Sequence, residues 1–474
     1  MKPSDKNQTI SGEVASTDSV PAAHNAPSHA PCPSGETADG TAKATASEGG
    51  DHSSRSASRI PLLRYPQLFA NFIPLILHQA IFRIAWIFKT ESVVIPAFLD
   101  TIADSGLARG VLPLINRTAQ SVSPLLLSQQ ISDSRLKSRW LLFSTLLMAL
   151  PFLVIGGSVF LLPTPLPGWF TSVFFLLYAV FFCFHGVNEI SFSTVVGKLI
   201  PAERRGRLTA LSASCGSFVA VILAWWLMGR WLNDPAGRPF GRIFLFVGSG
   251  MLLSVVVLLW LKEEPDSARP ARRSGTRHFR DAYQRIRDDA VLRRLCVFSS
   301  LFVFSQILFP HYQRLGLSQS ESSVQLLMVW VVAQHIGASV FSWISGHLAD
   351  RYGNRSALRF LTVAGAAAPI LSLALAGWLP VQWYFVTFFW LGLVPVTFRI
   401  QSNYALEITD RTRHPAYIST MRLCMAVPFL LSPGVGWLID RAGFQLPFLM
   451  VSAILAAAAA MTWFMYEPRD HATC

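Results

Sequence analysis

A few polar and ionisable side chains interrupt the long apolar runs of the chain, and these residues are the ones that could do chemistry there. An ionisable group inside an apolar span is costly and usually serves a binding site or an ion pathway. A desolvated carboxylate whose cationic partner can be exchanged is suited to taking up and releasing a proton. The candidates for a substrate or proton pathway are Arg83, Glu91, His185, Asn188, Glu189, Gln306, Arg399, Gln401 and Asn403.

The spacing of these residues predicts which of them can pair. On a continuous helix Arg83 and Glu91 share one face, but they lie about 12 Å apart along the axis, too far to pair with each other. Glu189 and Arg399 fall within about one helical turn of the same depth when the two halves of the chain are aligned. We therefore predict that Glu189 pairs with Arg399 or with Arg83. Lys89 falls on another face, where a structural ion pair is the simpler interpretation.

Other polar residues in the apolar runs have structural interpretations as well. For His185 and His335 a hydrogen-bonded packing role stands as the alternative to a proton relay. Arg117 and Arg422 are better interpreted as groups that hold neighbouring helices together than as ligands of a solute.

Enzyme chemistry is not predicted. The sequence contains no H-E-x-x-H segment, no Ser/Lys pair and no group of histidines at metal-ligand spacing. Its six cysteines include no C-x-x-C pair. We therefore expect no catalytic residues, no metal and no cofactor.

The elements that position these side chains follow from composition. Of 474 residues, 52% are hydrophobic and 14% are charged, whereas a soluble domain has about 25% charged residues. Such a chain cannot cover the surface of a soluble globule, so we expect an all-α integral membrane protein. The net charge of +13 sits in short segments between apolar runs, so it indicates membrane topology and no nucleic-acid partner.

The apolar runs predict about twelve membrane-spanning helices from residue 60 onward. Lysines and arginines gather in the loops after the second, fourth, sixth and eighth spans, while the loops at 163–168 and 379–382 carry no charge. Because basic loops stay in the cytoplasm, both termini are expected there, in the inner (plasma) membrane of the cell.

The chain also repeats itself, which predicts two pseudo-symmetric six-helix halves. Segment 95–98 matches 309–312, and segment 226–230 matches 437–441. Transporters are often built from such repeats, with the binding site between them. The expected organisation is a disordered cytoplasmic tail at 1–59, six-helix bundles at 60–261 and 295–468, a cytoplasmic connector with an amphipathic helix at 262–294, and a tail at 469–474.

The loop after the eighth expected span carries a motif with a mechanical meaning. Gly346 lets two helices approach closely, and Gly353 permits a tight turn. Asp350 can accept hydrogen bonds from a helix N-terminus or pair with Arg351 or Arg355.

Two further basic segments accompany this motif. In the first half Asp133 and Arg135 remain from a second copy that has lost both glycines, and Arg204, Arg205 and Arg207 follow the fourth span. Together these segments resemble the loops of the major facilitator superfamily. The resemblance implies a twelve-helix fold with alternating access, a cavity lined by the first, fourth, seventh and tenth helices, and gating loops that latch the cytoplasmic side.

The function expected from this resemblance is secondary active transport of a small polar or amphipathic organic solute. Several arginines inside the spans favour a solute with an anionic group, proton coupling fits the carboxylates, and a monomer in the lipid bilayer is expected. The alternatives are a sensor or lipid-handling protein on the same fold, which would show no flux, and a drug efflux pump. The fifth span lacks the G-P-x-x-G-G pattern of drug/proton antiporters, which argues against the pump.

Overall fold

The computed structural model describes residues 66–234, 237–266, 277–318, 325–410 and 413–467. Both expected tails, 1–59 and 469–474, lie outside the described residues, as does part of the expected connector at 267–276. Every regular element within the described ranges is a helix, as the composition predicts.

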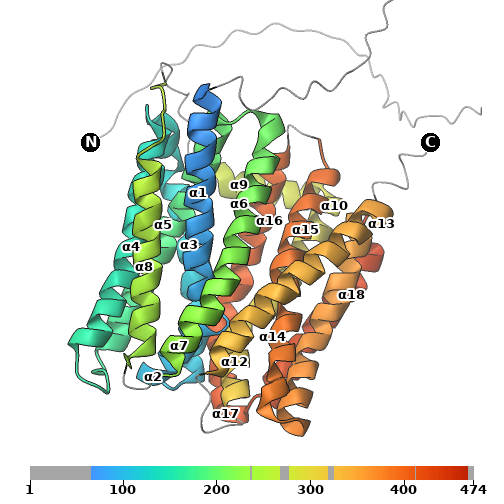
Figure 1. Ribbon diagram of the computed structural model, residues 1–474. Coiled ribbons are helices and arrows are strands. Elements are labelled where there is room, and N and C mark those ends of the chain that lie inside the picture. Colours follow the sequence, from blue (N-terminus) through green and yellow to red (C-terminus); the bar gives the residue numbers. More distant parts are fainter. Residues whose placement is uncertain (1–65, 235–236, 267–276, 319–324, 411–412, 468–474) are drawn as a thin grey trace, which may run out of the picture. The chain divides into compact units, whose positions relative to one another are not determined.

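The first group of helices, here called the N-terminal half, is drawn in blue to green in Figure 1. Its elements are α1 (Pro66–Phe88), α2 (Val94–Ile102), α3 (Gly106–Asp133), α4 (Lys137–Leu161), α5 (Phe170–Leu199), α6 (Ala202–Leu223), the π-helix η2 (Ala224–Met228), α7 (Gly229–Leu232) and α8 (Pro239–Leu258). Within this half α4 packs on α5 and α8, α1 packs on α6 and α8, and α3 packs on α5.

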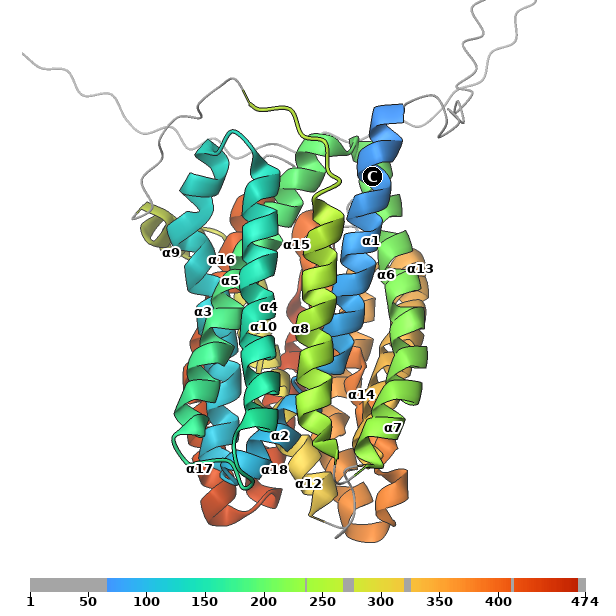
Figure 2. The same cartoon turned by 60° about the vertical axis from the view of Figure 1, so that its left-hand side comes forward.

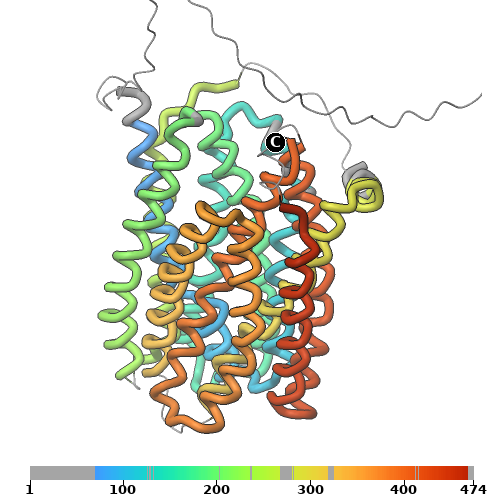
Figure 3. Tube along the Cα trace, turned by 90° about the vertical axis from the view of Figure 1, so that its right-hand side faces the viewer, coloured from blue at the N-terminus to red at the C-terminus, as the bar shows by residue number. Residues whose placement is uncertain are grey.

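The second group, here called the C-terminal half, follows helix α9 (Arg277–Asp288) and is yellow to red in Figure 3. Its elements are α10 (Ala290–Phe302), α11 (Phe304–Ile307), α12 (Phe309–Leu317), α13 (Leu326–Trp378), η4 (Val381–Tyr384), α14 (Phe385–Leu391), α15 (Leu393–Glu407), α16 (His414–Ala426), η5 (Val427–Leu431), α17 (Ser432–Ala442), α18 (Gln445–Met461) and η6 (Thr462–Phe464). Here α13 packs on α14, α15 and α18, and α10 packs on α16 and α18.

The number of spans agrees with the sequence. In the described ranges, 10 helical segments are long and apolar enough to cross a membrane. One of these, α13, is two helices joined at Gly353, whose φ of 86° interrupts the helix. α3 has 28 residues and is of spanning length, although it is not among the 10. These segments are consistent with the expected twelve helices.

The first membrane-spanning rod is broken, which corrects one prediction. α1 ends at Phe88 and α2 begins at Val94, and the intervening residues are not helical. Arg83 and Glu91 therefore do not share the face of one continuous helix. The Thr90 hydroxyl accepts a hydrogen bond of 3.2 Å from the backbone N–H of Val94, which helps α2 to begin after the break.

The two halves meet closely at the end of the bundle where the loops 103–105 and 443–444 lie (Figure 2). It is here called the opposite end, because it lies opposite the end that carries the basic loops. α3 packs on α17 and α2 packs on α12. A Cβ atom on Gly106 would strike the backbone oxygen of Gly436, and one on Gly110 would strike that of Ser432. Only glycine permits this approach of the two helices.

Asp440, at the end of α17, fastens this contact. Its carboxylate accepts hydrogen bonds from the backbone N–H groups of Gly106 at 2.6 Å and Leu107 at 3.0 Å, and from the Ser105 hydroxyl at 3.1 Å. A side chain of the C-terminal half therefore caps the first turn of α3, where unsatisfied N–H groups favour a negative charge.

At the other end, here called the basic end, Glu263 joins elements of the N-terminal half. Its side chain is 2% exposed and accepts from Lys198 Nζ at 2.8 Å and from the backbone N–H groups of Lys137 and Ser138. Burial by itself would raise the pKa of Glu263, but these hydrogen bonds outweigh burial, so the pKa lies below its usual value of 4.5.

We expect Asp440→Ala to loosen the opposite end, because the first turn of α3 loses its cap. Spin labels at Thr101 of α2 and Leu446 of α18, on a chain whose native cysteines are replaced by serine, should report a longer or broader distance distribution. Asp234→Ala is the matched control, since Asp234 pairs with Arg242 of the same half at 3.0 Å. An unchanged distribution in Asp440→Ala would show that this cap does not hold the halves together.

Glu263 should make thermal stability depend on pH. A carboxylate with a lowered native pKa stabilises the fold above its unfolded pKa, and this contribution is lost as the pH falls through the native value. Glu263→Gln should therefore lower the melting temperature clearly at pH 7 and much less below pH 4. An equal loss at both pH values would contradict the ionised role of Glu263.

Candidate functional site

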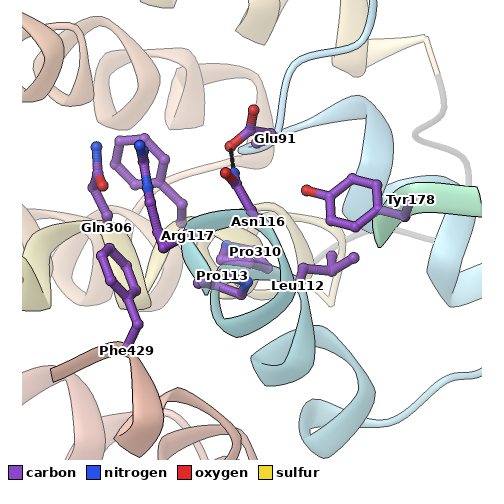
Figure 4. A pocket seen from close by; sticks show the side chains of 10 residues that line it. Glu91, Leu112, Pro113, Asn116, Arg117, Tyr178, Gln306, Pro310 and Phe429 are labelled. Carbon is purple, nitrogen blue, oxygen red and sulfur yellow. Dashed lines mark hydrogen bonds between the residues drawn. The ribbon is translucent and has the colours of Figure 1, made fainter. Parts of the chain in front are cut away.

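A small pocket lies between the two halves, with a cavity volume of about 20 Å³ within about 290 Å³ of space that includes open solvent. The N-terminal half contributes residues of α3, the break after α1, and Tyr178 of α5, while the C-terminal half contributes residues of α11, α12 and η5 (Figure 4). Its lining residues are Glu91, Leu112, Pro113, Asn116, Arg117, Tyr178, Gln306, Phe309, Pro310 and Phe429. The wall is thus mostly apolar with a few polar groups, as in small-molecule sites.

The break in the first rod allows a buried ion pair beside this pocket. Lys89 Nζ lies 2.9 Å from Glu91 Oε1, although the two residues are only two positions apart. Asn116 of α3 donates a hydrogen bond to the other oxygen of Glu91, as Figure 4 shows. Lys89 thus has the structural pair that its sequence position suggested, and Glu91 has the partner that the sequence did not name.

Aromatic rings enclose the Lys89 ammonium on its other sides. Lys89 is fully buried, and its Nζ lies 3.3 Å from the ring centroid of Trp86, 4.7 Å from that of Phe181 and 4.6 Å from that of Phe182. Ring faces attract cations, so these contacts compensate part of the lost hydration. His185 packs against Trp86 at 4.6 Å between centroids, and its Nδ1 has no partner among the described residues.

Arg117 carries a positive charge to the pocket wall. Its guanidinium donates to Gln120 Oε1 at 3.4 Å and lies 5.6 Å from the ring centroid of Phe429 in the other half. Gln306, a predicted site residue, lines the same pocket, on the same side as Arg117 and Phe429 in Figure 4. α11, which carries Gln306, and α3, which carries Arg117, therefore line the same part of the pocket.

Glu189 does not make the predicted ion pair with Arg399 or Arg83. Its carboxylate accepts a hydrogen bond of 2.9 Å from Gln120 Nε2. The reason is packing: α5, which carries Glu189, lies against α3, which carries Gln120. The charges close enough to act on Glu189 are those of His185, Arg422 and Arg117.

Arg83 and Arg399 interact with each other instead of with a carboxylate. Arg83 Nε donates to Ser217 Oγ of α6 at 2.7 Å, and its guanidinium is near enough to Arg399 of α15 for their like charges to repel. Both side chains are exposed, and neither belongs to an ion pair within the described ranges. The arginines come from different halves.

The remaining predicted pathway residues divide between packing and open positions. Asn188 is buried and donates to Ser144 at 3.1 Å and Thr145 at 2.7 Å, so it joins α5 to α4 away from the pocket. Gln401 is fully buried with no partner for its amide among the described residues, and Asn403 is exposed.

Comparisons with known proteins agree with this architecture. A family model described as the Major Facilitator Superfamily matches residues 118–398 and 331–473. The chain belongs to the major facilitator superfamily. It is therefore a multi-pass membrane protein of a transporter superfamily. A search of curated protein sequences gave no match.

Solved structures share the fold at low sequence identity. A variant of the nucleoside transporter NupG has a TM-score of 0.64 at 15% identity, with 84% of this chain and 100% of that chain covered. A D-xylose–proton symporter has a TM-score of 0.58 at 16% identity, with 85% and 99% covered. The E. coli fucose:proton symporter FucP has a TM-score of 0.54 at 14% identity, with 85% and 100% covered.

In this major facilitator the turn predicted at Gly353 is present, whereas the close approach predicted at Gly346 is not. Gly353 adopts a positive φ of 86°, as the tight turn requires. Gly346 is not a point of close approach, because a Cβ atom there would meet nothing within 4 Å. Arg355 donates to the backbone oxygens of Thr462 at 3.0 Å and Trp463 at 2.7 Å, which ties the turn to the end of α18 and η6.

The other predicted gating residues lie on exposed or partly exposed positions at the basic end. Arg205 donates to the carbonyls of Ile200 at 2.9 Å and Gly197 at 2.7 Å, which caps the C-terminus of α5. The hydrogen bonds of Arg205 and Arg355 thus stay within one half. Asp133 ends α3, Arg135 lies in the loop that follows, Arg204 and Arg207 lie in α6, and Asp350 and Arg351 lie in α13. Their latching role remains a prediction.

The sequence missed several pocket residues for an identifiable reason. Asn116, Arg117 and Tyr178 line the pocket and Gln120 bonds to Glu189. None of the four was a predicted site residue, because rotation of α3 and α5 about their axes decides which side chains face the pocket. The one available signal was the polar spacing of Asn116 and Gln120, which lie four residues apart on one helical face.

We expect Lys89→Met to destabilise the protein by about 3 kcal/mol, because it leaves the Glu91 carboxylate without its buried cation. Thermal unfolding in detergent measures this, with the exposed Lys262→Met as the control. Lys89→Met combined with Glu91→Gln should recover part of the loss. A double variant less stable than Lys89→Met alone would show that the pair is not a coupled unit.

Proposed function

We propose that this protein is a secondary active transporter that moves a small organic solute with an anionic group through the inner (plasma) membrane by alternating access. The observation that carries the proposal is the pocket between the halves, because its lining combines apolar side chains with Glu91, Arg117 and Gln306.

The arrangement of contacts supports alternating access. At the opposite end, Asp440 and Arg314 of the C-terminal half bond to α3 and to Asp104 of the N-terminal half. A carrier must break such contacts on one side while closing the other. The positive-inside rule places the basic end in the cytoplasm, so this conformation would be closed toward the outside.

The nature of the solute is supported by the charges and by the neighbours. The similar structures are those of a nucleoside transporter, a D-xylose–proton symporter and a fucose:proton symporter, whose cargoes are small and polar. Arg83, Arg117, Arg399 and Arg422 add cationic groups that suit an anionic substituent.

Proton coupling is assigned to Glu189 in this proposal. Its carboxylate is exposed and bonds to the neutral amide of Gln120, while Arg422 and Arg117 supply nearby positive charge. When the solute's anionic group engages these cations, they no longer stabilise the charge of the Glu189 carboxylate. The carboxylate can then take up a proton as the solute arrives.

Uptake into vesicles tests the function. A thermal-shift screen of sugars, organic acids, amino acids and nucleosides on purified protein selects a radiolabelled solute for proteoliposomes. Arg399→Ala should reduce uptake about tenfold or more, since a charge-assisted contact is lost. Glu189→Gln should abolish proton-driven accumulation but retain exchange of internal for external solute.

The control variant is Arg230→Ala, which removes an exposed arginine stacked on Trp226 and should leave uptake unchanged. Normal uptake in both Arg399→Ala and Glu189→Gln would refute the assigned site. Binding of a solute without any flux would favour the sensor or lipid-handling alternative.

A further inference from the structure

The middle of the bundle holds an excess of positive charge. Among the residues that the structure describes, seven charged side chains lie eight or more residues, or about 12 Å, from both ends of their helical rods. Five are cationic and two are carboxylates, which leaves an excess of three positive charges. The seven are Arg83, Lys89, Glu91, Arg117, Glu189, Arg399 and Arg422.

The opposite end of the bundle carries a smaller excess, of two positive charges, among the described residues: Arg109, Arg230, Arg238, Arg242, Arg314 and Arg441 against Asp100, Asp104, Asp234 and Asp440. There Arg109 bonds to Asp100 and to Asp104, and Arg314 bonds to Asp104. Asp440 supplies a further negative charge beside them. Charges at the two ends of the bundle lie close to water, whereas the excess of three at the depth of the pocket lies about 12 Å from either end of the rods.

The two carboxylates serve only one part of this charged group. Glu91 is acted on by Lys89, Arg117 and His185. Glu189 is acted on by His185, Arg422 and Arg117. Arg83 and Arg399 appear in neither set, and neither forms an ion pair with a carboxylate within the described ranges.

Arg83 and Arg399 are arranged like two sides of an anion site. They come from α1 and α15, which belong to different halves, and their like charges act on each other. Ser217 Oγ lies 2.7 Å from Arg83 Nε. His335 of α13 is close enough to Arg83 to be affected by its charge, and its buried Nε2 has no partner among the described residues.

Charge of this kind is costly away from water unless something compensates it. Guanidinium groups bind carboxylate, phosphate and sulfate groups through paired hydrogen bonds. A neutral solute would leave the excess uncompensated when the carrier closes around it, and a solute with one negative charge would leave two of the three positive charges.

We propose that the solute carries two or more negative charges, and that Arg83 and Arg399 bind one of its anionic groups between the two halves. This inference rests on the proposed transport function, whose substrate class it specifies. The second group of cations, Arg117 and Arg422, then faces the rest of the solute together with Gln306.

A series of compounds of one size tests this directly. Succinamide, succinamate and succinate share a four-carbon skeleton and differ in charge by one unit at each step. In thermal-shift titrations of the full chain in neutral detergent at constant ionic strength, succinate should stabilise most and succinamide not at all. Sulfate should likewise stabilise more than chloride. Equal shifts along the series, or no shift with any member, would overturn the proposal.

Variants assign the effect to the arginine pair. Arg83→Gln and Arg399→Gln should each weaken succinate binding about tenfold or more, and Arg83→Lys should keep the preference for two charges because it keeps the cation. Arg230→Gln is the matched control, since it removes one exposed arginine outside the pocket. If Arg230→Gln weakened succinate binding as much as Arg83→Gln, the site would not be the one proposed.

An anionic lipid headgroup offers the same chemistry, and a further titration separates the two. Phosphatidylglycerol added to the micelles should not displace succinate. Displacement that disappears in Arg83→Gln would assign the pair to lipid and overturn the solute proposal.

Failure of this inference differs from failure of the transport function. Proteoliposomes that move a neutral sugar with no preference for charge would refute the inference and leave transport intact. A chain that binds succinate through Arg83 but gives no flux of any bound solute would refute transport and leave the anion site.

Discussion

Every charge that enters an apolar interior needs a partner, and the first membrane-spanning rod is shaped by that constraint. The fully buried Lys89 pairs with Glu91 two residues later. Residues two apart point to different sides of a regular α-helix, so the pair can form only where the helix is interrupted. The break between α1 and α2 satisfies the charge, and it also brings Glu91 and Asn116 to the wall of the pocket.

The contact between the halves depends on close backbone packing and on hydrogen bonds to Asp440. The glycines on α3 and α17 allow backbone to meet backbone, and Asp440 satisfies N–H groups that water would otherwise bond. When the contact opens, water can replace the carboxylate, so the net cost is only about 1 kcal/mol for each hydrogen bond. A contact of this kind can be specific and still reversible, which alternating access requires.

The sequence predicted the framework well because the framework depends on properties that every residue contributes. Apolar run length, basic loops and the turn at Gly353 are local or additive features, and the helical fold, the superfamily and the positive φ of Gly353 agree with them. The sequence could also find Glu91, Glu189 and Arg399, since a charge in an apolar run is visible without a structure.

Partner choice could not be predicted in the same way. The Glu189–Arg399 pair assumed that equal depth implies contact, but depth fixes only one of three coordinates. The rotation of α5 toward α3 gives Glu189 to Gln120, and the same packing turns Asn188 toward Ser144 and Thr145. The close helix approach predicted at Gly346 was wrong because a sequence motif identifies the glycine but not the element that packs against it. Among the described residues, no atom lies within 4 Å of a Cβ built on Gly346.

The unpaired arginines suggest how binding and movement can be linked through charge alone. Arg83 and Arg399 belong to different halves and repel each other, so in the empty carrier this interaction favours separation of the halves at that depth. An anion between them turns one repulsion into two attractions, and the effect grows as water leaves the site and the effective dielectric constant falls. Binding of an anion would then favour approach of the two halves at the depth of Arg83 and Arg399. The Lys89–Glu91 pair would not change with that movement, because both residues belong to the N-terminal half.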